Sequence, residues 1–127
     1  MLKTEILNAP LLSALATLGH TDTVVIADCG LPLPVDATVV DLALVRGRLG
    51  FEEVLKVLTE NLEIEASTLA SEASGGPVEQ WVAGYGLDPR YISHEQLKAE
   101  LPQAKLIVRT GETTAYANII LHCGVAF

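Results

Sequence analysis

The chain has 127 residues, of which half are apolar and 19% are charged, and its formal net charge is -8. This length and composition indicate a single globular domain with a sizeable core, and they exclude a disordered chain. The negative charge, with no basic stripe to offset it, argues against nucleic acid or an anionic membrane surface as a partner. No stretch reaches the roughly 18 consecutive apolar residues that a membrane span requires.

The N-terminal segment predicts a helix. Asn8 precedes the apolar pattern and Pro10 stands in its first turn, and both are typical of a helix start. Leucines then recur at helical spacing as far as Leu18, and Gly19 is the expected C-terminal cap. Because Glu5 and Asn8 interrupt the apolar run, we interpret the segment as part of the folded protein rather than as a signal peptide.

The next apolar run, Val24 to Ala27, predicts a strand. It is continuous and rich in β-branched residues, which is typical of a strand buried on both faces of a parallel sheet. His20 and Asp22 precede it, Asp28 follows it directly, and a loop rich in glycine and proline comes next. Ligands of open α/β sheets bind beyond the carboxyl ends of strands, so Asp28 either accepts hydrogen bonds from a polyol or holds the loop backbone.

The remaining elements alternate between strands and helices. The pattern predicts a short strand or extended segment at residues 39–45, strands at 106–108 and 117–125, and helices at 51–62, 78–85 and from 93 onward. Residues 64–70 suit either a strand or a helix, and we favour a strand because Gly75, Gly76 and Pro77 break the chain soon after. The last of these helices begins with the capping-box pattern SHEQ at residues 93–96. This alternation predicts an α/β fold with three α/β/α layers around a central, mostly parallel sheet, in one domain.

Four further side chains join His20 and Asp28 as candidates for a small-ligand site. His94 and Lys98 are four residues apart and share a helical face, where they either contact a ligand or lie in solvent. Tyr116 and Asn118 are two apart at the expected start of a strand, so both point to one face. A phenol and an amide in an otherwise apolar element are typical of the few polar groups that orient a small ligand, or of a strand edge bonded to water.

His20 is the candidate for proton transfer. An imidazole titrates near neutral pH, so it can act as general acid or base, although a histidine after a helix can also satisfy backbone groups. Asp22 either orients that imidazole by accepting its N–H or caps the turn. The three histidines, His20, His94 and His122, lack the spacing of metal ligands, so we expect no metal.

Other functional motifs are missing from the sequence. There is no GxSxG, Walker or GxGxxG pattern, so acyl transfer, nucleotide hydrolysis and dinucleotide redox chemistry have no motif here. Cys29 and Cys123 also lack metal-ligand spacing, and we expect free thiols in a reducing compartment.

Three blocks of the sequence resemble the D-ribose pyranase family, or ribose mutarotases, to which the fucose mutarotases are a sister group. They are GHTDTVVIADCGLPLP at 19–34, SHEQLK at 93–98 and RTGETTAYANIILHCGVAF at 109–127. The resemblance implies a cytosolic enzyme without a cofactor that interconverts the pyranose and furanose forms of D-ribose and is linked to ribose uptake. It implies a ring-like homo-oligomer, a homodecamer, with its sites between subunits. It implies His20 as the catalytic acid and sugar contacts from Asp28, His94, Lys98, Tyr116 and Asn118.

The chemistry of the candidate residues is compatible with this interpretation. Carboxylate, phenol, amide and imidazole groups suit a neutral, hydroxyl-rich sugar, and the arginine cluster expected for a sugar phosphate is missing. Lys98 and Arg109 are the two cations that could still meet a phosphate. The alternatives are a mutarotase for fucose or another sugar, and a monosaccharide-binding module without catalysis. We also expect Phe127 to be buried against a neighbouring subunit, because its exposure would be unfavourable.

Overall fold

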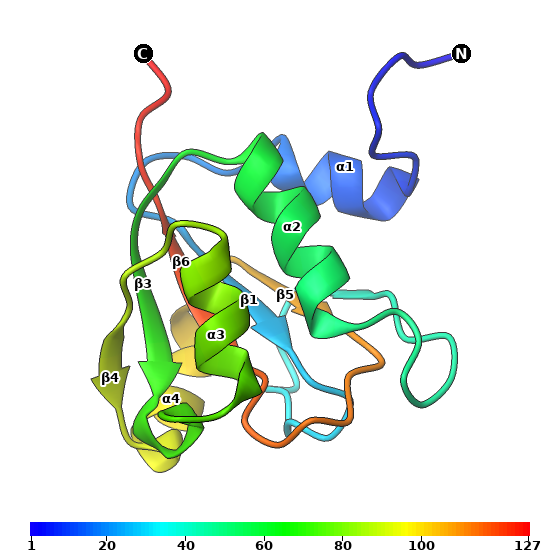
Figure 1. Cartoon of the computed structure of the whole chain (residues 1–127). Helices are drawn as coiled ribbons and strands as arrows, with labels where there is room; N and C mark the ends of the chain where they lie inside the picture. Colours follow the sequence, from blue (N-terminus) through cyan, green and yellow to red (C-terminus); the bar gives the residue numbers. More distant parts are fainter.

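The structure is a computed structural model that describes residues 1–127, and it is built around one six-stranded sheet (Figure 1). The strands are β1 Thr23–Ala27, β2 Val39–Asp41, β3 Ile64–Ala70, β4 Arg90–Ile92, β5 Leu106–Arg109 and β6 Ile119–Cys123. The helices are α1 Ala9–Leu15, α2 Phe51–Asn61, α3 Pro77–Gly84 and α4 His94–Glu100, with short 3-10 turns at Ser71–Ala73 and Leu101–Gln103. The strand order is β2-β5-β1-β6-β3-β4. Only β6 runs antiparallel to its neighbours, so the prediction of a mostly parallel sheet is confirmed.

Strand β1 lies in the middle of the sheet and is buried on both faces, as its continuous apolar sequence predicts. Val24 and Ile26 pack into the larger core cluster on one face. Val25 and Ala27 pack into a smaller cluster on the other face. The period-two alternation of a strand therefore divides four consecutive apolar residues between two cores.

The two faces of the sheet are covered unequally. Helices α1, α2 and α3 lie on the face of the larger cluster, and α4 with its following 3-10 turn lies on the other face (Figure 1). The apolar stripe of α2 is buried, and its Phe51 ring lies 6.2 Å from the Trp81 ring of α3. This arrangement confirms the predicted three-layer α/β/α architecture.

Several predicted boundaries differ from the structure. Helix α1 ends at Leu15 rather than near Leu18, because Thr17 turns back and donates both its N–H and its hydroxyl to the carbonyl of Ala14. The strand predicted at residues 39–45 is only β2, and the chain then forms a small hairpin in which Val45 pairs with Arg48. The predicted strand at 117–125 shortens to β6.

Strand β4 was missed. It has three residues, none of them fully buried, and it lies at the edge of the sheet beside β3. A strand of this kind has no apolar run or alternation that the sequence could reveal.

The direction of β6 determines which loops meet. Because β6 is antiparallel to β1, the end of β1 and the loop leading into β6 share one edge of the sheet, which we call the Asp28 edge after the residue that follows β1. The start of β1, the end of β6 and the start of β3 share the opposite edge, which we call the His20 edge. In Figure 1 the C-terminal segment extends upward from the His20 edge, and the loop leading into β6 lies at the bottom.

Candidate functional site

Asp28 and Asn118 form the centre of the Asp28 edge. The Asn118 amide donates to Asp28 Oδ2 at 2.9 Å, and its oxygen accepts the Asp28 backbone N–H at 2.8 Å. Asp28 Oδ1 also accepts the N–H of Gly30 at 2.9 Å, so this carboxylate does hold the following loop. Each carboxylate oxygen has two acceptor sites, and Asp28 is only half-buried, so capacity for a ligand hydroxyl remains.

Tyr116 and His94 extend this centre. The Asn118 N–H donates to the Tyr116 carbonyl at 2.8 Å, and the Tyr116 ring stands edge-on to the His94 ring with centroids 5.2 Å apart. His94 is the first residue of α4, and its backbone N–H donates to Glu72 at 2.7 Å. The structure thus brings four of the six predicted site residues into one continuous set of contacts, which we call the Asp28 cluster: Asp28, His94, Tyr116 and Asn118.

His94 has an unpaired polar atom in this cluster. Its Nδ1 is the one buried side-chain nitrogen or oxygen in the chain that has no hydrogen-bond partner. A buried polar atom left unpaired costs about 1–3 kcal/mol. A ligand hydroxyl at this position would remove that cost.

The prediction that Tyr116 and Asn118 point to one face of a strand was wrong. Both precede β6 in a tight turn, Tyr116 has a positive φ of 60°, and its side chain is exposed whereas Asn118 is fully buried. The amide therefore acts from inside the fold on Asp28, and the phenol faces outward beside His94.

The two cations near the cluster are already paired. Lys98 forms an ion pair with Glu95 on the surface of α4, and its hydrogen bond lowers the pKa of the Glu95 carboxyl. Arg109 donates to both carboxylate oxygens of Asp41, at 2.9 and 3.1 Å, and to the carbonyl of Cys29 at 3.1 Å. Lys98 thus has Glu95 as its partner rather than a member of the Asp28 cluster, and Arg109 fixes the backbone that follows Asp28.

Glu112 anchors the loop that carries Tyr116. One of its oxygens accepts the N–H of Phe51 at the start of α2, and the other accepts the N–H groups of Thr113 and Thr114 and the Thr114 hydroxyl. Partial burial alone would raise the pKa of Glu112, but these hydrogen bonds outweigh it and hold the pKa below the usual value of 4.5. The sequence left the role of this residue open, since its contact with the start of α2 joins residues 61 positions apart.

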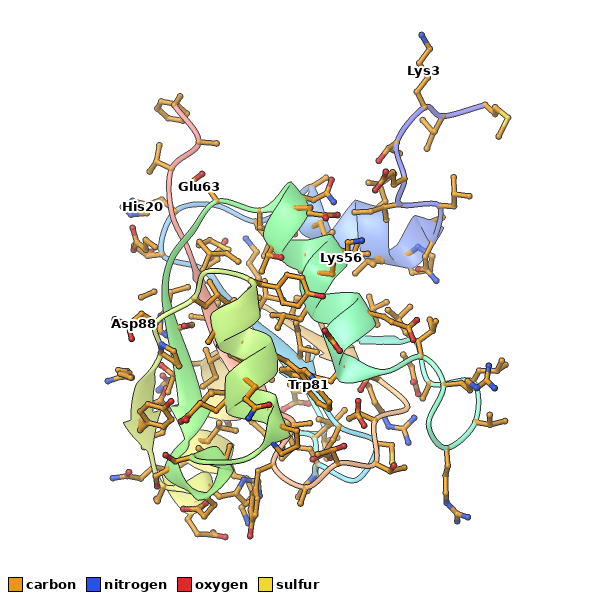
Figure 2. All side chains as sticks on the ribbon, viewed as in Figure 1. Lys3, His20, Lys56, Glu63, Trp81 and Asp88 are labelled. Carbon is orange, nitrogen blue, oxygen red and sulfur yellow. The ribbon has the colours of Figure 1, made fainter.

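The His20 edge contains a different set of groups, of which Figure 2 labels His20. His20 is exposed, and its Nε2 lies 3.1 Å from a carboxylate oxygen of Glu65. Asp22 instead accepts the N–H of Gly19 at 2.7 Å and the ammonium group of Lys105 at 3.0 Å. Both bonds lower the pKa of Asp22, the Gly19 bond more. Of the two roles open to Asp22, the structure therefore favours capping of the turn.

Sequence reasoning missed Glu65. It is 45 residues from His20, and it reaches the imidazole only because β3 lies next but one to β1 in the sheet. An acidic residue near the start of a strand is too common to single out from sequence.

His20 and the Asp28 cluster lie at opposite ends of β1 in one chain. At about 3.3 Å per residue, the five residues of β1 alone span roughly 16 Å, which a monosaccharide does not bridge. Near His20 there is a separate cavity of about 340 Å³, lined by His20, Leu18, Leu62, Cys123 and the C-terminal segment 124–127.

The structure offers no metal cluster and no membrane helix. No three His, Cys, Asp or Glu residues are grouped so that they could hold a metal ion. None of the helices has the length and apolar character needed to cross a membrane. Both cysteines are free, and burial, followed by the charges of Asp22 and Glu65, raises the pKa of the Cys123 thiol.

Comparison with known proteins extends over the whole chain. A protein named D-ribose pyranase from Cutibacterium acnes is 45% identical over 127 residues, with all of both chains covered. The solved structure of Bacillus subtilis RbsD complexed with D-ribose matches this chain with a TM-score of 0.94. The two sequences are 40% identical, and the match covers all of both chains. The fucose mutarotase of Streptococcus pneumoniae in complex with L-fucose is 27% identical over 94% of each chain, with a TM-score of 0.77.

A family model gives the same assignment. The model of the RbsD / FucU transport protein family matches residues 1–126. The identity of 45% to a D-ribose pyranase over the full length and the fold shared with RbsD agree with this match. The chain therefore belongs to the RbsD / FucU transport protein family.

Proposed function

We propose that this chain is a D-ribose pyranase, an isomerase that interconverts the pyranose and furanose forms of D-ribose. One observation carries the proposal: the Asp28 cluster brings together a carboxylate held by a buried amide, a phenol and an unpaired imidazole nitrogen. Full-length similarity to a D-ribose pyranase and to RbsD complexed with D-ribose supports the same substrate. The whole chain then acts as a single ribose-pyranase-like domain.

The groups of the cluster suit a neutral sugar. Asp28 accepts hydrogen bonds from hydroxyls, the Tyr116 phenol donates or accepts, and His94 Nδ1 takes one further hydroxyl. Asn118 acts by holding Asp28 in place. Lys98 contributes a further contact if it leaves Glu95 when the sugar binds. The pairing of Arg109 with Asp41 and Cys29 argues against a phosphate group as the main determinant.

The reaction needs only proton transfers. When the pyranose opens, the bond between C1 and the ring oxygen breaks, the anomeric hydroxyl loses a proton and the ring oxygen gains one. The C4 hydroxyl of the open-chain aldehyde then attacks C1 and loses its proton, while the carbonyl oxygen gains one, so the furanose forms with no net change in atoms. We assign these transfers to His20 as the catalytic acid, since an imidazole both donates and accepts near neutral pH.

The site forms between subunits in this proposal. His20 and the Asp28 cluster lie at opposite ends of β1, so one sugar meets both only if the His20 edge of one chain faces the Asp28 edge of another. Such a contact joins two different surfaces, and repeated contacts of this kind form a ring when the rotation between subunits closes. We accordingly propose a ring-like homo-oligomer, a homodecamer, that works in the cytosol without a cofactor.

Saturation-transfer NMR on equilibrated D-ribose tests the activity. We expect the wild-type protein to accelerate exchange between the pyranose and furanose signals over buffer. Loss of the general acid typically costs about a hundredfold or more, so His20→Ala is expected to lose most of that acceleration. A wild-type exchange rate equal to that of buffer would rule out the enzyme.

The main alternative is a mutarotase for fucose, which the structural similarity to a fucose mutarotase favours. Exchange measured in parallel on D-ribose, L-fucose and D-galactose separates the two. We expect the largest acceleration with D-ribose, in line with the higher TM-score and identity to RbsD. Calorimetric binding of ribose without faster exchange would instead indicate a sugar-binding module.

A further inference from the structure

We infer that Glu65 is the positioning residue for His20: it holds the ring through Nε2–H and leaves Nδ1 as the nitrogen that exchanges protons with the sugar. This inference rests on the proposed function and names a residue and an atom that it does not specify. The direct observation is the distance of 3.1 Å between His20 Nε2 and Glu65 Oε2.

The local backbone explains how Glu65 reaches the ring. In the pairing of β3 with β6, Ile64 lies opposite Cys123 and Ala66 lies opposite His122, with a shift of register between them. Glu65 is therefore the extra residue of a β-bulge. Bulges redirect a side chain and are frequent beside active sites, and this one directs a carboxylate past the end of β6 toward His20.

The chemistry of the contact determines the tautomer. An ionised carboxylate can only accept hydrogen bonds, so a neutral imidazole bonded to it through Nε2 carries its proton there. Nδ1 then has the free lone pair that accepts a proton, and in the protonated ring it has the proton to donate. Asp22, the nearer acid in sequence, makes no hydrogen bond to His20, and its Oδ2 accepts from Gly19 and Lys105 instead.

Because His20 and Glu65 are exposed, the effect of Glu65 on the orientation of the His20 ring can be measured without a loss of stability. Within a single chain the side chains of His20 and Glu65 are 52% and 47% exposed, and exposed ion pairs contribute little to the stability of that chain. Removal of Glu65 is therefore expected to leave the unfolding midpoint nearly unchanged. An effect on ribose exchange would then reflect the ring of His20 rather than a loss of fold.

The test compares Glu65→Ala, Glu65→Gln and a control, Glu60→Ala, which removes an exposed acid of α2. Apparent kcat and KM come from exchange rates at several ribose concentrations. We expect Glu65→Ala to lower kcat about tenfold with KM within about twofold, by analogy with the loss seen when a residue that orients a metal-bound histidine is removed. Glu65→Gln should recover most of kcat, because its amide oxygen accepts the same bond, and Glu60→Ala should match wild type.

Nitrogen-15 NMR of the histidine rings gives a readout that does not depend on activity. We expect His20 to be the Nε2–H tautomer in the wild-type protein and a mixture of tautomers in Glu65→Ala. The inference would be overturned if the neutral His20 ring of the wild-type protein carried its proton on Nδ1, or if Glu65→Ala left kcat unchanged. Neither result would contradict the pyranase activity. If instead the wild-type protein does not accelerate ribose exchange, the proposed function fails, and the tautomer still decides the Glu65 contact.

Discussion

At the scale of single residues, Asn118 determines the state of Asp28. Its amide is fully buried and makes two hydrogen bonds to Asp28, one to the side chain and one to the backbone. This geometry fixes the carboxylate rotamer before a ligand arrives. A preorganised acceptor of this kind reduces the entropy lost on binding.

Asn118→Asp places a second carboxylate against Asp28 with almost no change in shape. We expect a loss of about 1–3 kcal/mol in the free energy of unfolding, because a buried donor is lost and like charges meet. Ribose affinity should fall with it. Urea unfolding and calorimetry measure the two effects, with Asn61→Asp at the exposed end of α2 as the control. Equal stability of Asn118→Asp and wild type would contradict the geometry.

Glu112 makes the fold less stable as the pH falls into the acid range. Its pKa in the folded state lies below the usual value of 4.5, since its hydrogen bonds outweigh the effect of burial. A carboxyl with a lowered folded pKa stabilises the fold above its unfolded pKa, and this contribution disappears as the pH falls through the folded pKa.

Glu112→Gln tests this linkage. At neutral pH we expect the variant to be less stable than wild type by about 1 kcal/mol or more, because the amide cannot accept from all of the donors. The difference should shrink as the pH falls below 4.5. Urea unfolding over a pH series measures it, and Glu60→Gln serves as the control. A difference that grows toward acid pH would show that the sign is wrong.

At the scale of elements, the hairpin after β2 packs directly on the loop that carries the site. Gly111 donates to the carbonyl of Leu49 and accepts from the N–H of Gly47, both at 2.7 Å. A Cβ at this glycine would lie 1.9 Å from the carbonyl oxygen of Arg48. The close approach of two backbones, rather than an unusual φ, is what requires glycine here.

Gly111→Ala is therefore expected to destabilise the fold by about 1–3 kcal/mol, since the hairpin or the loop has to move. Gly84→Ala is the matched control, because a Cβ there meets nothing within 4 Å. It lies in α3, where alanine is favoured by about 0.5–1 kcal/mol. Thermal unfolding distinguishes the two, and Gly111→Ala as stable as Gly84→Ala would refute the close contact.

At the scale of the whole molecule, the C-terminal segment marks an uncovered apolar surface. Phe127 is fully exposed in the single chain, and Val125 is 39% exposed beside the His20 cavity. The burial of Phe127 against a neighbouring subunit remains a prediction, but within one chain nothing covers its side chain.

Deletion of residues 125–127 should leave the fold intact and weaken the assembly, because these residues contribute exposed rather than buried surface. Sedimentation velocity is expected to give a smaller species than the wild-type protein. Ala126→Ser, which keeps both apolar neighbours, should sediment like wild type. An unchanged sedimentation coefficient after the deletion would exclude the segment from the subunit contact.

The shared site predicts complementation between inactive subunits. His20→Ala and Asp28→Asn each remove one half of the site, so each variant alone should lose most of the acceleration of ribose exchange. When the two are unfolded together and refolded at equal amounts, about a quarter of the contacts between subunits pair two intact halves, and activity should return to that level. No recovery in verified mixed oligomers would place both halves of the site in one chain or outside it.

The sequence alone could predict those features that depend on residues close together in the chain. The continuous apolar run of β1, the capping box of α4 and the alternation of elements were enough for the α/β class, because burial and capping depend on neighbouring residues. The residue types of the Asp28 cluster were also found, since three of its members stand beside β1 or β6 or at the start of α4. Strand β4 and the end of α1 were not predicted, because the sequence patterns that mark them are weak.

Only the tertiary structure decided which polar groups meet. Contacts between His20 and Glu65, Arg109 and Asp41, and Asn118 and Asp28 join residues 45, 68 and 90 positions apart. These pairs depend on the order β2-β5-β1-β6-β3-β4, which follows from how all the apolar faces are buried together and not from any one segment. The same order puts His20 and Asp28 at opposite edges of the sheet, a separation that their closeness in sequence concealed.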